Sequence, residues 1–168
     1  MRPLLALALA AGCAMTATAH ELRCSLQAPA RATAGAPVML RFTLSNTGRT
    51  PVQVLQWNTP FEDGWFSPYV ELTRDGVPVP YNGPMVKRAE PSADQYFRLA
   101  AGASRSVEVD LALPFDLSVP GRYHVAPRLH LIDVAGAGTV PRPRSRHSGA
   151  PLDCNPVDIE VGPPRGRG

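Results

Sequence analysis

The sequence has few of the features that catalysis or membrane insertion requires. The zinc-peptidase motif His-Glu-x-x-His is absent, and so are the Gly-x-Ser-x-Gly nucleophile turn and a phosphate-binding loop. The apolar run at residues 4–10 is too short to cross a bilayer as a helix. The formal net charge of +3 is too small to indicate nucleic-acid binding. We therefore predict a protein that is not an enzyme, needs no cofactor, binds no nucleic acid and has no membrane span.

A leader of the secretory type is expected at the amino terminus. Arg2 precedes the apolar run, and residues 17–19 (Ala-Thr-Ala) supply the small side chains of a cleavage site. We expect residues 1–19 to be a signal peptide, the mature chain to begin at His20, and the protein to be secreted or periplasmic. The alternative is lipoprotein processing at Cys13, although Ala10 stands where such signals usually carry Leu.

Cysteine is scarce, with three residues in the whole sequence. Cleavage before His20 removes Cys13 and leaves Cys24 and Cys154, and two cysteines in an oxidising compartment predict a disulfide. In the chain-entropy account, closing a loop of about 130 residues stabilises by roughly 5 kcal/mol at most. Two free buried thiols are the alternative. Zinc binding by the pair alone is disfavoured because zinc normally takes four ligands.

Helical periodicity is absent, and short runs instead alternate apolar with polar residues between Pro and Gly. Such runs begin near Leu22, Val38, Val52, Val70, Val77, Val107, Tyr123 and Val157. The 19 prolines also argue against helices. We predict an all-β fold for residues 20–162, an immunoglobulin-like antiparallel β-sandwich of about seven to eight strands. The Gly-, Pro- and Arg-rich residues 163–168 are predicted to be a disordered tail.

Two segments near the carboxyl end have distinct predicted roles. Tyr123 follows a Pro-Gly turn, which is typical of a sandwich corner whose tyrosine hydroxyl bonds back to the upstream backbone. Residues 135–149 have little apolar content and predict a mobile loop. Basic residues gather in it between Arg142 and His147, where Pro and Gly neighbours favour a solvated loop over a binding groove. A site for an anionic surface or a glycan is the alternative.

The histidines offer one metal hypothesis. If the mature chain begins at His20, its free amine and imidazole can chelate copper, with His124 or His130 as a third ligand. On one continuous strand, His124 and His130 would stand ~20 Å apart, too far to chelate one ion together. A copper-binding protein or copper monooxygenase is therefore an alternative function. The competing interpretation is that His20 follows the cleavage site by chance.

Aromatic residues are concentrated after the third alternating run. Trp57, Phe61, Trp65 and Phe66 lie within ten residues of one another. They are candidate anchors for a protein partner, because aromatic rings dominate the energetics of interfaces. Lys87 and Arg88 are candidates for pairing with acidic groups on that partner. The alternative is that the rings belong to the sandwich core, more so for Trp57 than for Trp65 and Phe66.

A family resemblance sharpens this hypothesis. Residues 55–62 (LQWNTPFE) resemble part of the amino-terminal, non-catalytic region of bacterial deuterolysin-type (M35) zinc endopeptidases. The likeness continues through residues 74–84, 87–91, 94–96, 99–104 and 116–123, and it spans roughly residues 22 to 130. The resemblance implies an immunoglobulin-like pro-domain without the catalytic part that carries His-Glu-x-x-His, so no catalytic residue is carried over.

The predicted function follows from this likeness. It implies a secreted module that binds a protein partner such as a secreted zinc metallopeptidase, as an inhibitor or a folding helper. A generic envelope structural or interaction domain without a protease link is the other alternative. The two cysteines and the Arg-rich loop have no place in the family pattern.

Overall fold

The computed structural model describes residues 21–136, 138 and 140–164. The predicted leader with Cys13, the mature terminus at His20, and residues 165–168 of the predicted tail lie outside the described residues. The proposed domain limits therefore stay predictions, although the last described strand does end at Gly162.

The described residues form thirteen strands and three short 3-10 helices. The strands are β1 (Leu22–Gln27), β2 (Arg31–Thr33), β3 (Met39–Asn46), β4 (Val52–Leu55), β5 (Val70–Arg74), β6 (Val77–Val79), β7 (Tyr96–Leu99), β8 (Ser104–Asp110), β9 (Gly121–Pro127), β10 (His130–Leu131), β11 (Val134–Ala135), β12 (Ala150–Pro151) and β13 (Val157–Gly162). The 3-10 helices are η1 (Pro60–Glu62), η2 (Ala93–Gln95) and η3 (Arg144–Arg146). No helix among them has the length and apolarity needed to cross a bilayer.

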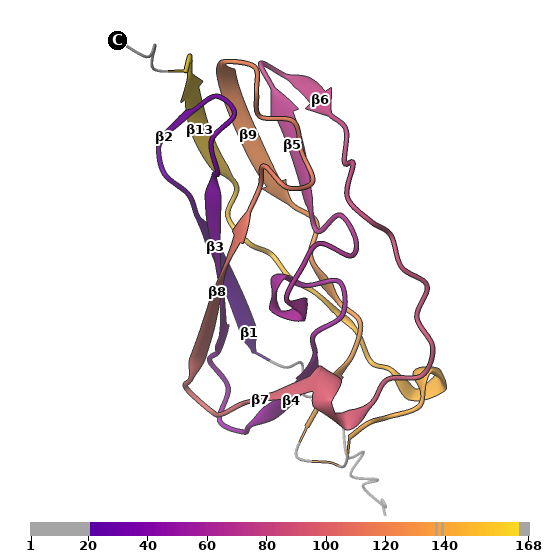
Figure 1. The fold of residues 1–168 in the computed structure, drawn as a ribbon. Helices are drawn as coiled ribbons and strands as arrows, with labels where there is room; N and C mark the ends of the chain where they lie inside the picture. Colours follow the sequence, from indigo (N-terminus) through magenta and orange to yellow (C-terminus); the bar gives the residue numbers. More distant parts are fainter. Residues whose placement is uncertain (1–20, 137, 139, 165–168) are drawn as a thin grey trace, which may run out of the picture.

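Two main sheets build the domain. One has the order β1-β3-β8, and the other has the order β2-β13-β9-β5-β6. The smaller sheets β11-β4-β7 and β10-β12 complete the fold, and β4 and β7 lie at the end away from β6 (Figure 1). The pairs are antiparallel except for β2, which runs parallel to β13. The prediction of an all-β, immunoglobulin-like sandwich is confirmed. Eight strands have four or more residues, and the other five are short segments.

The alternating runs supply the core because every second side chain of a strand points to the same face. On β3, Leu40, Phe42 and Leu44 are fully buried, while Arg41 between them is exposed. The opposite sheet contributes its own inner face, and both sets belong to one continuous hydrophobic cluster. Burial of one face of each sheet therefore fixes the register of the strands.

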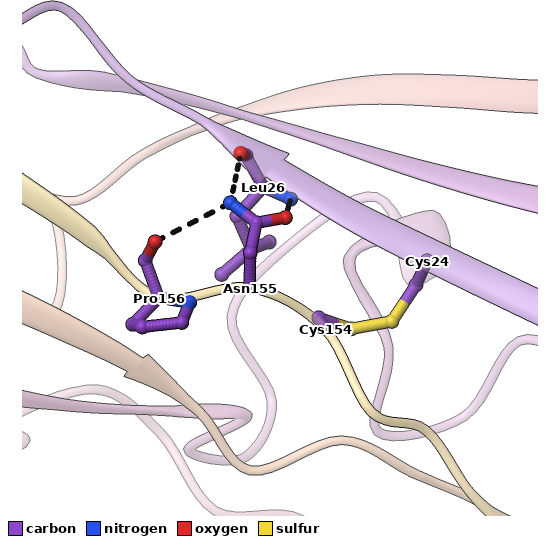
Figure 2. Close-up of a disulfide and its surroundings, with 5 residues drawn as sticks. All are labelled: Cys24, Leu26, Cys154, Asn155 and Pro156. Atoms are coloured by element: carbon purple, nitrogen blue, oxygen red, sulfur yellow. Dashed lines mark hydrogen bonds between the residues drawn. A yellow bond between two sulfur atoms is a disulfide. The ribbon is translucent and has the colours of Figure 1, made fainter.

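The predicted disulfide joins β1 to the segment that leads into β13. Cys24 bonds Cys154 across a sequence separation of 130 residues, with the Cα atoms 5.0 Å apart. Beside it, the Asn155 side chain donates from Nδ2 to the Leu26 carbonyl at 2.9 Å and accepts from the Leu26 N–H at 3.1 Å (Figure 2). The covalent bond and this amide pair thus fasten the first strand of the domain to the approach of its last one.

The tyrosine corner is also present. Tyr123 on β9 is fully buried, and its hydroxyl donates to the Val119 carbonyl at 2.7 Å. Its role is structural, because the bond ties the turn before β9 to the strand itself.

Candidate functional site

The aromatic segment leaves β4 and turns through a short helical loop. Thr59 caps η1: its Oγ1 accepts from the Phe61 N–H at 3.2 Å and donates to the Gln56 carbonyl at 2.6 Å. Asn58 and Asp63 adopt positive φ angles of 56° and 60°, a conformation that Asn and Asp tolerate better than most residues. The sequence Asn-Thr-Pro therefore ends the strand and begins η1, as its turn chemistry requires.

Three of the four candidate aromatic anchors lie in the interior. Trp57, Phe61 and Trp65 are 3%, 6% and 6% exposed. Phe61 packs against Phe42 and Phe97, with ring centroids 5.2 Å and 4.8 Å away. These rings contribute mainly to packing, and they offer a partner little surface.

Trp65 occupies a second aromatic group. It stacks on Tyr69 with the centroids 4.2 Å apart, and its indole Nε1 donates to the Asp110 carbonyl at 3.0 Å. Phe66, the fourth candidate, is half-buried. The rings that sequence reasoning grouped as anchors are thus split between core and surface, and their role in binding stays a prediction.

Arg88 joins this segment to the candidate basic residues. Its guanidinium carbon lies 5.4 Å from the ring centroids of both Trp57 and Phe66. It also forms a salt bridge with Glu62, whose Oε2 accepts from the Asn58 N–H at 3.0 Å. Its neighbour Lys87 is exposed and stands outside this arrangement. The structure therefore brings Arg88 together with Trp57 and Phe66, as part of the scaffold around them.

The carboxyl of Glu62 is in an unusual environment. Its side chain is only 7% exposed. Burial raises the pKa of Glu62, and this effect exceeds the opposing influence of the Asn58 N–H and the Arg88 cation. The salt bridge therefore offsets only part of the desolvation that the fold imposes on this acid.

A cleft of about 460 Å³ opens beside Arg88. It is lined by Trp57, Asn58, Val86, Lys87, Arg88, Ile132 and Arg144. Both basic candidates from the sequence are in this group, but Phe61, Trp65 and Phe66 are not. We name this feature the basic cleft.

Arg144 belongs to the basic run between Arg142 and His147, for which the sequence favoured a solvated loop over a binding groove. Its Nη1 donates to the Arg88 carbonyl at 2.9 Å, and its backbone N–H donates to the Glu90 carboxylate at 2.9 Å. The sequence predicted a mobile loop here; these contacts dock the loop on the segment of Arg88 and Glu90, and its mobility stays a prediction. Because Pro and Gly surround the arginines, the composition resembled a solvated loop, and only the paired long-range contacts reveal its docking.

The base of the same loop is fastened by a buried acid. Asp133 is fully buried and forms a salt bridge with Arg142, whose Nε donates to Oδ2 at 3.0 Å. It also accepts from the Tyr96 hydroxyl at 2.8 Å and from the Ser148 N–H at 2.9 Å. Burial acts to raise the pKa of Asp133, but hydrogen bonds from Arg142, Ser148 and Tyr96 outweigh it and lower that pKa overall.

The histidines of the copper hypothesis have ordinary surroundings. His124 on β9 lies 2.7 Å through Nδ1 from Asp158 Oδ1, and His130 pairs with Pro151 in the short β10–β12 ladder. No group of three or more His, Cys, Asp or Glu side chains suited to a metal occurs in the part of the chain that the structure describes. His20, on which the hypothesis depends, lies outside that part, so the copper alternative stays untested.

Comparison with known proteins finds partial likeness to two proteases. An extracellular protease from Aeromonas hydrophila is 39% identical over 88 residues, which are 52% of this chain and 25% of that protein. A neutral protease 2 homolog from Uncinocarpus reesii (strain UAMH 1704) is 29% identical over 118 residues, 69% of this chain and 33% of that protein. The chain thus spans a quarter to a third of the length of these curated relatives.

Two further comparisons add little. No protein-family model matches the sequence. Among solved structures, the CARDB domain of a Pyrococcus furiosus protein, in complex with di-metal ions, aligns over 87% of this chain and 96% of that one. The sequence identity is 10% and the TM-score 0.38, so no conclusion about function follows from it. The chain is homologous over part of its length to proteases.

Proposed function

We propose that this protein is a secreted, non-catalytic β-sandwich module that binds a protein partner, with a secreted zinc metallopeptidase as the first candidate. It acts on that partner as an inhibitor or as a folding helper, in the manner that a deuterolysin-type pro-domain would. The partial likeness to two proteases carries the proposal. A likeness confined to part of a protease, in a chain without His-Glu-x-x-His, fits an accessory module better than a peptidase.

The accessible side chains around the basic cleft are the surface that we assign to the partner. Phe66 is half-buried and Lys87 is exposed, while Met85 and Val86 beside it are 77% and 42% exposed. Aromatic residues and Met are enriched at the centre of protein interfaces, where a polar rim surrounds them. Trp57, which lines the cleft, supports this surface from below, and Phe61 and Trp65 pack in the interior.

Binding to a deuterolysin-type zinc peptidase secreted by the source organism tests the proposal. The mature protein is immobilised, and association is measured by biolayer interferometry with an unrelated zinc peptidase as the specificity control. We expect saturable binding that is weakened by Phe66→Ala and Lys87→Glu. Val77→Ala, a change at a 62% exposed residue of β6, is the matched surface control and should leave binding unchanged.

A functional assay separates the two modes of action. An inhibitor slows hydrolysis of a peptide substrate by the folded peptidase, whereas a folding helper raises the yield of active peptidase on refolding without slowing the folded enzyme. Absence of both effects, together with no association at tens of micromolar, would refute the proposal and leave a generic envelope domain.

A further inference from the structure

The basic cleft combines a concave shape with a surplus of positive charge. Its lining includes Lys87, Arg88 and Arg144 and no acidic residue. Of these three, only Arg88 takes part in a salt bridge, with Glu62, among the described residues. The Glu90 carboxylate that accepts from the Arg144 N–H offsets part of the remaining charge, so three cations face two carboxylates and the hollow of about 460 Å³ has a surplus of about one positive charge.

Arg144 is held in place by contacts that a merely solvated loop would lack. Arg144 is bonded at its guanidinium to the Arg88 carbonyl and at its backbone to Glu90. Arg142, two residues earlier, is fixed by the buried Asp133. A guanidinium positioned before binding loses less conformational entropy when a ligand arrives, so this arrangement favours recognition over simple solubility.

Two residues that line the cleft carry buried N–H groups without an acceptor among the described residues. Trp57 lines the cleft and is 97% buried, and its Nε1 has no acceptor among the described residues. The Arg88 Nε is likewise buried without an acceptor there. Because these N–H groups are themselves buried, they are not offered to a ligand in the cleft, and the preference for anionic oxygen atoms rests on the surplus positive charge of the lining.

From this geometry we propose that the basic cleft seats a carboxylate from an acidic segment of a protein partner. Lys87 and Arg144 pair with the carboxylate, and Val86 and Ile132 contact its aliphatic stem. The guanidinium of Arg144 offers a planar pair of donors that matches a carboxylate, and Lys87 adds a point charge. This inference deepens the proposed function, on which it rests, by naming the chemistry that the partner presents.

Lys87 makes a direct test possible because it is the single lysine of the sequence. Reductive ¹³C-methylation labels its amine and the chain's amino terminus, and the two signals are distinguished with Lys87→Gln. An acetylated and amidated octapeptide rich in Glu and Leu is titrated in, with its Gln counterpart as the uncharged probe. We expect the Glu peptide to shift the Lys87 signal saturably at 50 mM NaCl and the Gln peptide not to do so. At 500 mM NaCl the shift should fall severalfold, because salt screens exposed charges.

Matched variants locate the site. Arg144→Gln and Lys87→Gln each lower the affinity for the Glu peptide severalfold, measured by fluorescence anisotropy, and the double variant lowers it about tenfold or more. Arg146→Gln removes the same charge from the same loop, but Arg146 does not line the cleft, so it should change affinity less than twofold. Equal losses from Arg144→Gln and Arg146→Gln would indicate diffuse charge attraction and overturn the proposal.

Three further outcomes are decisive. If inorganic phosphate binds as tightly as the peptide and displaces it, the cleft is a general anion site and the carboxylate assignment is wrong. If the peptidase binds wild-type protein and Arg144→Gln equally well, this inference fails while the proposed function stands. If the Glu peptide binds and no peptidase does, the proposed function fails while the acidic specificity of the cleft survives.

Discussion

Arg142 forms a salt bridge with Asp133 at the base of the loop that carries Arg144, and the acid is fully buried while the arginine side chain is 27% exposed. The same carboxylate also accepts from Tyr96 and Ser148. The pair therefore connects the loop to Tyr96 on β7 and to the segment between β10 and β11, where Asp133 lies. The position of the basic cleft depends on this connection.

Replacing Arg142 by Gln should destabilise the protein by roughly 3 kcal/mol, because it leaves a buried carboxylate without its cation. Urea unfolding followed by circular dichroism measures the change. Arg146→Gln, in the same loop and exposed, is the matched control and should stay within about 0.5 kcal/mol of wild type. Equal stabilities of the two variants would contradict the anchoring role of the pair.

The stabilising effect of Asp133 should depend on pH in a defined direction. The folded-state pKa of Asp133 lies below its unfolded-state pKa, and the unfolded-state pKa is about 3.9. Its contribution to stability is therefore present above about pH 4 and is lost as the pH falls through the folded-state pKa. We expect the difference in unfolding free energy between wild type and Asp133→Asn to be largest at pH 5 to 7 and to shrink towards pH 2. A difference that grows on acidification would contradict the shift.

The sequence predicts most of the sandwich because period-two alternation reports directly which face of a strand is buried. The runs at Leu22, Val38, Val70 and Val157 each became a strand close to the expected bounds. The hairpin between β5 and β6 also follows from its turn, since Asp75 and Gly76 adopt the positive φ angles of 49° and 82° that such a turn requires.

Elements that alternation does not mark were missed. β7 has three buried residues out of four, so its pattern is nearly continuous rather than alternating. β11 and β12 have two residues each, too few for any periodicity. Their positions follow from pairing with strands that lie far away in sequence.

The basic cleft was only half predictable. Lys87 and Arg88 were found because they follow one another in the resembling segment, whereas Arg144 lies 56 residues beyond Arg88. Sequence also cannot tell a buried aromatic from an exposed one in an irregular loop. Trp57 and Phe66 flank one guanidinium, yet one is buried and the other half-exposed.

Replacing Arg88 by Gln should raise the pKa of Glu62 further. Burial already raises that pKa, and the Arg88 cation is one of the influences that lower it. With a raised folded-state pKa, the contribution of Glu62 to stability is present below the unfolded-state value of about 4.3 and is lost as the pH rises through the folded-state pKa. NMR titration of the Glu62 carboxyl carbon measures the change. Lys87→Gln is the control, and an equal rise in that variant would mean that the salt bridge has no specific effect.

Removing the disulfide should cost up to roughly 5 kcal/mol, because a loop of 130 residues is then released in the unfolded chain. The Cys24→Ser/Cys154→Ser double variant is compared with wild type by urea unfolding without reductant. Wild type with reductant should unfold at nearly the same urea concentration as the variant. If reductant leaves the wild-type midpoint unchanged while the variant is much less stable, the loss comes from side-chain packing rather than from the cross-link.

Replacing Tyr123 by Phe should destabilise by about 1 kcal/mol, since it removes the hydroxyl that bonds Val119 while keeping the fully buried ring. Tyr81→Phe is the matched control. Its hydroxyl bonds the Pro84 carbonyl at 2.9 Å in an exposed segment where water replaces the lost partner, so the change should be a few tenths of a kcal/mol. Thermal unfolding of both variants measures the difference, and a larger loss from Tyr81→Phe would contradict a stabilising corner at Tyr123. Because Tyr123 lies on β9, next to β13 and β5, the expected loss reflects the global stability of the sandwich rather than local fraying.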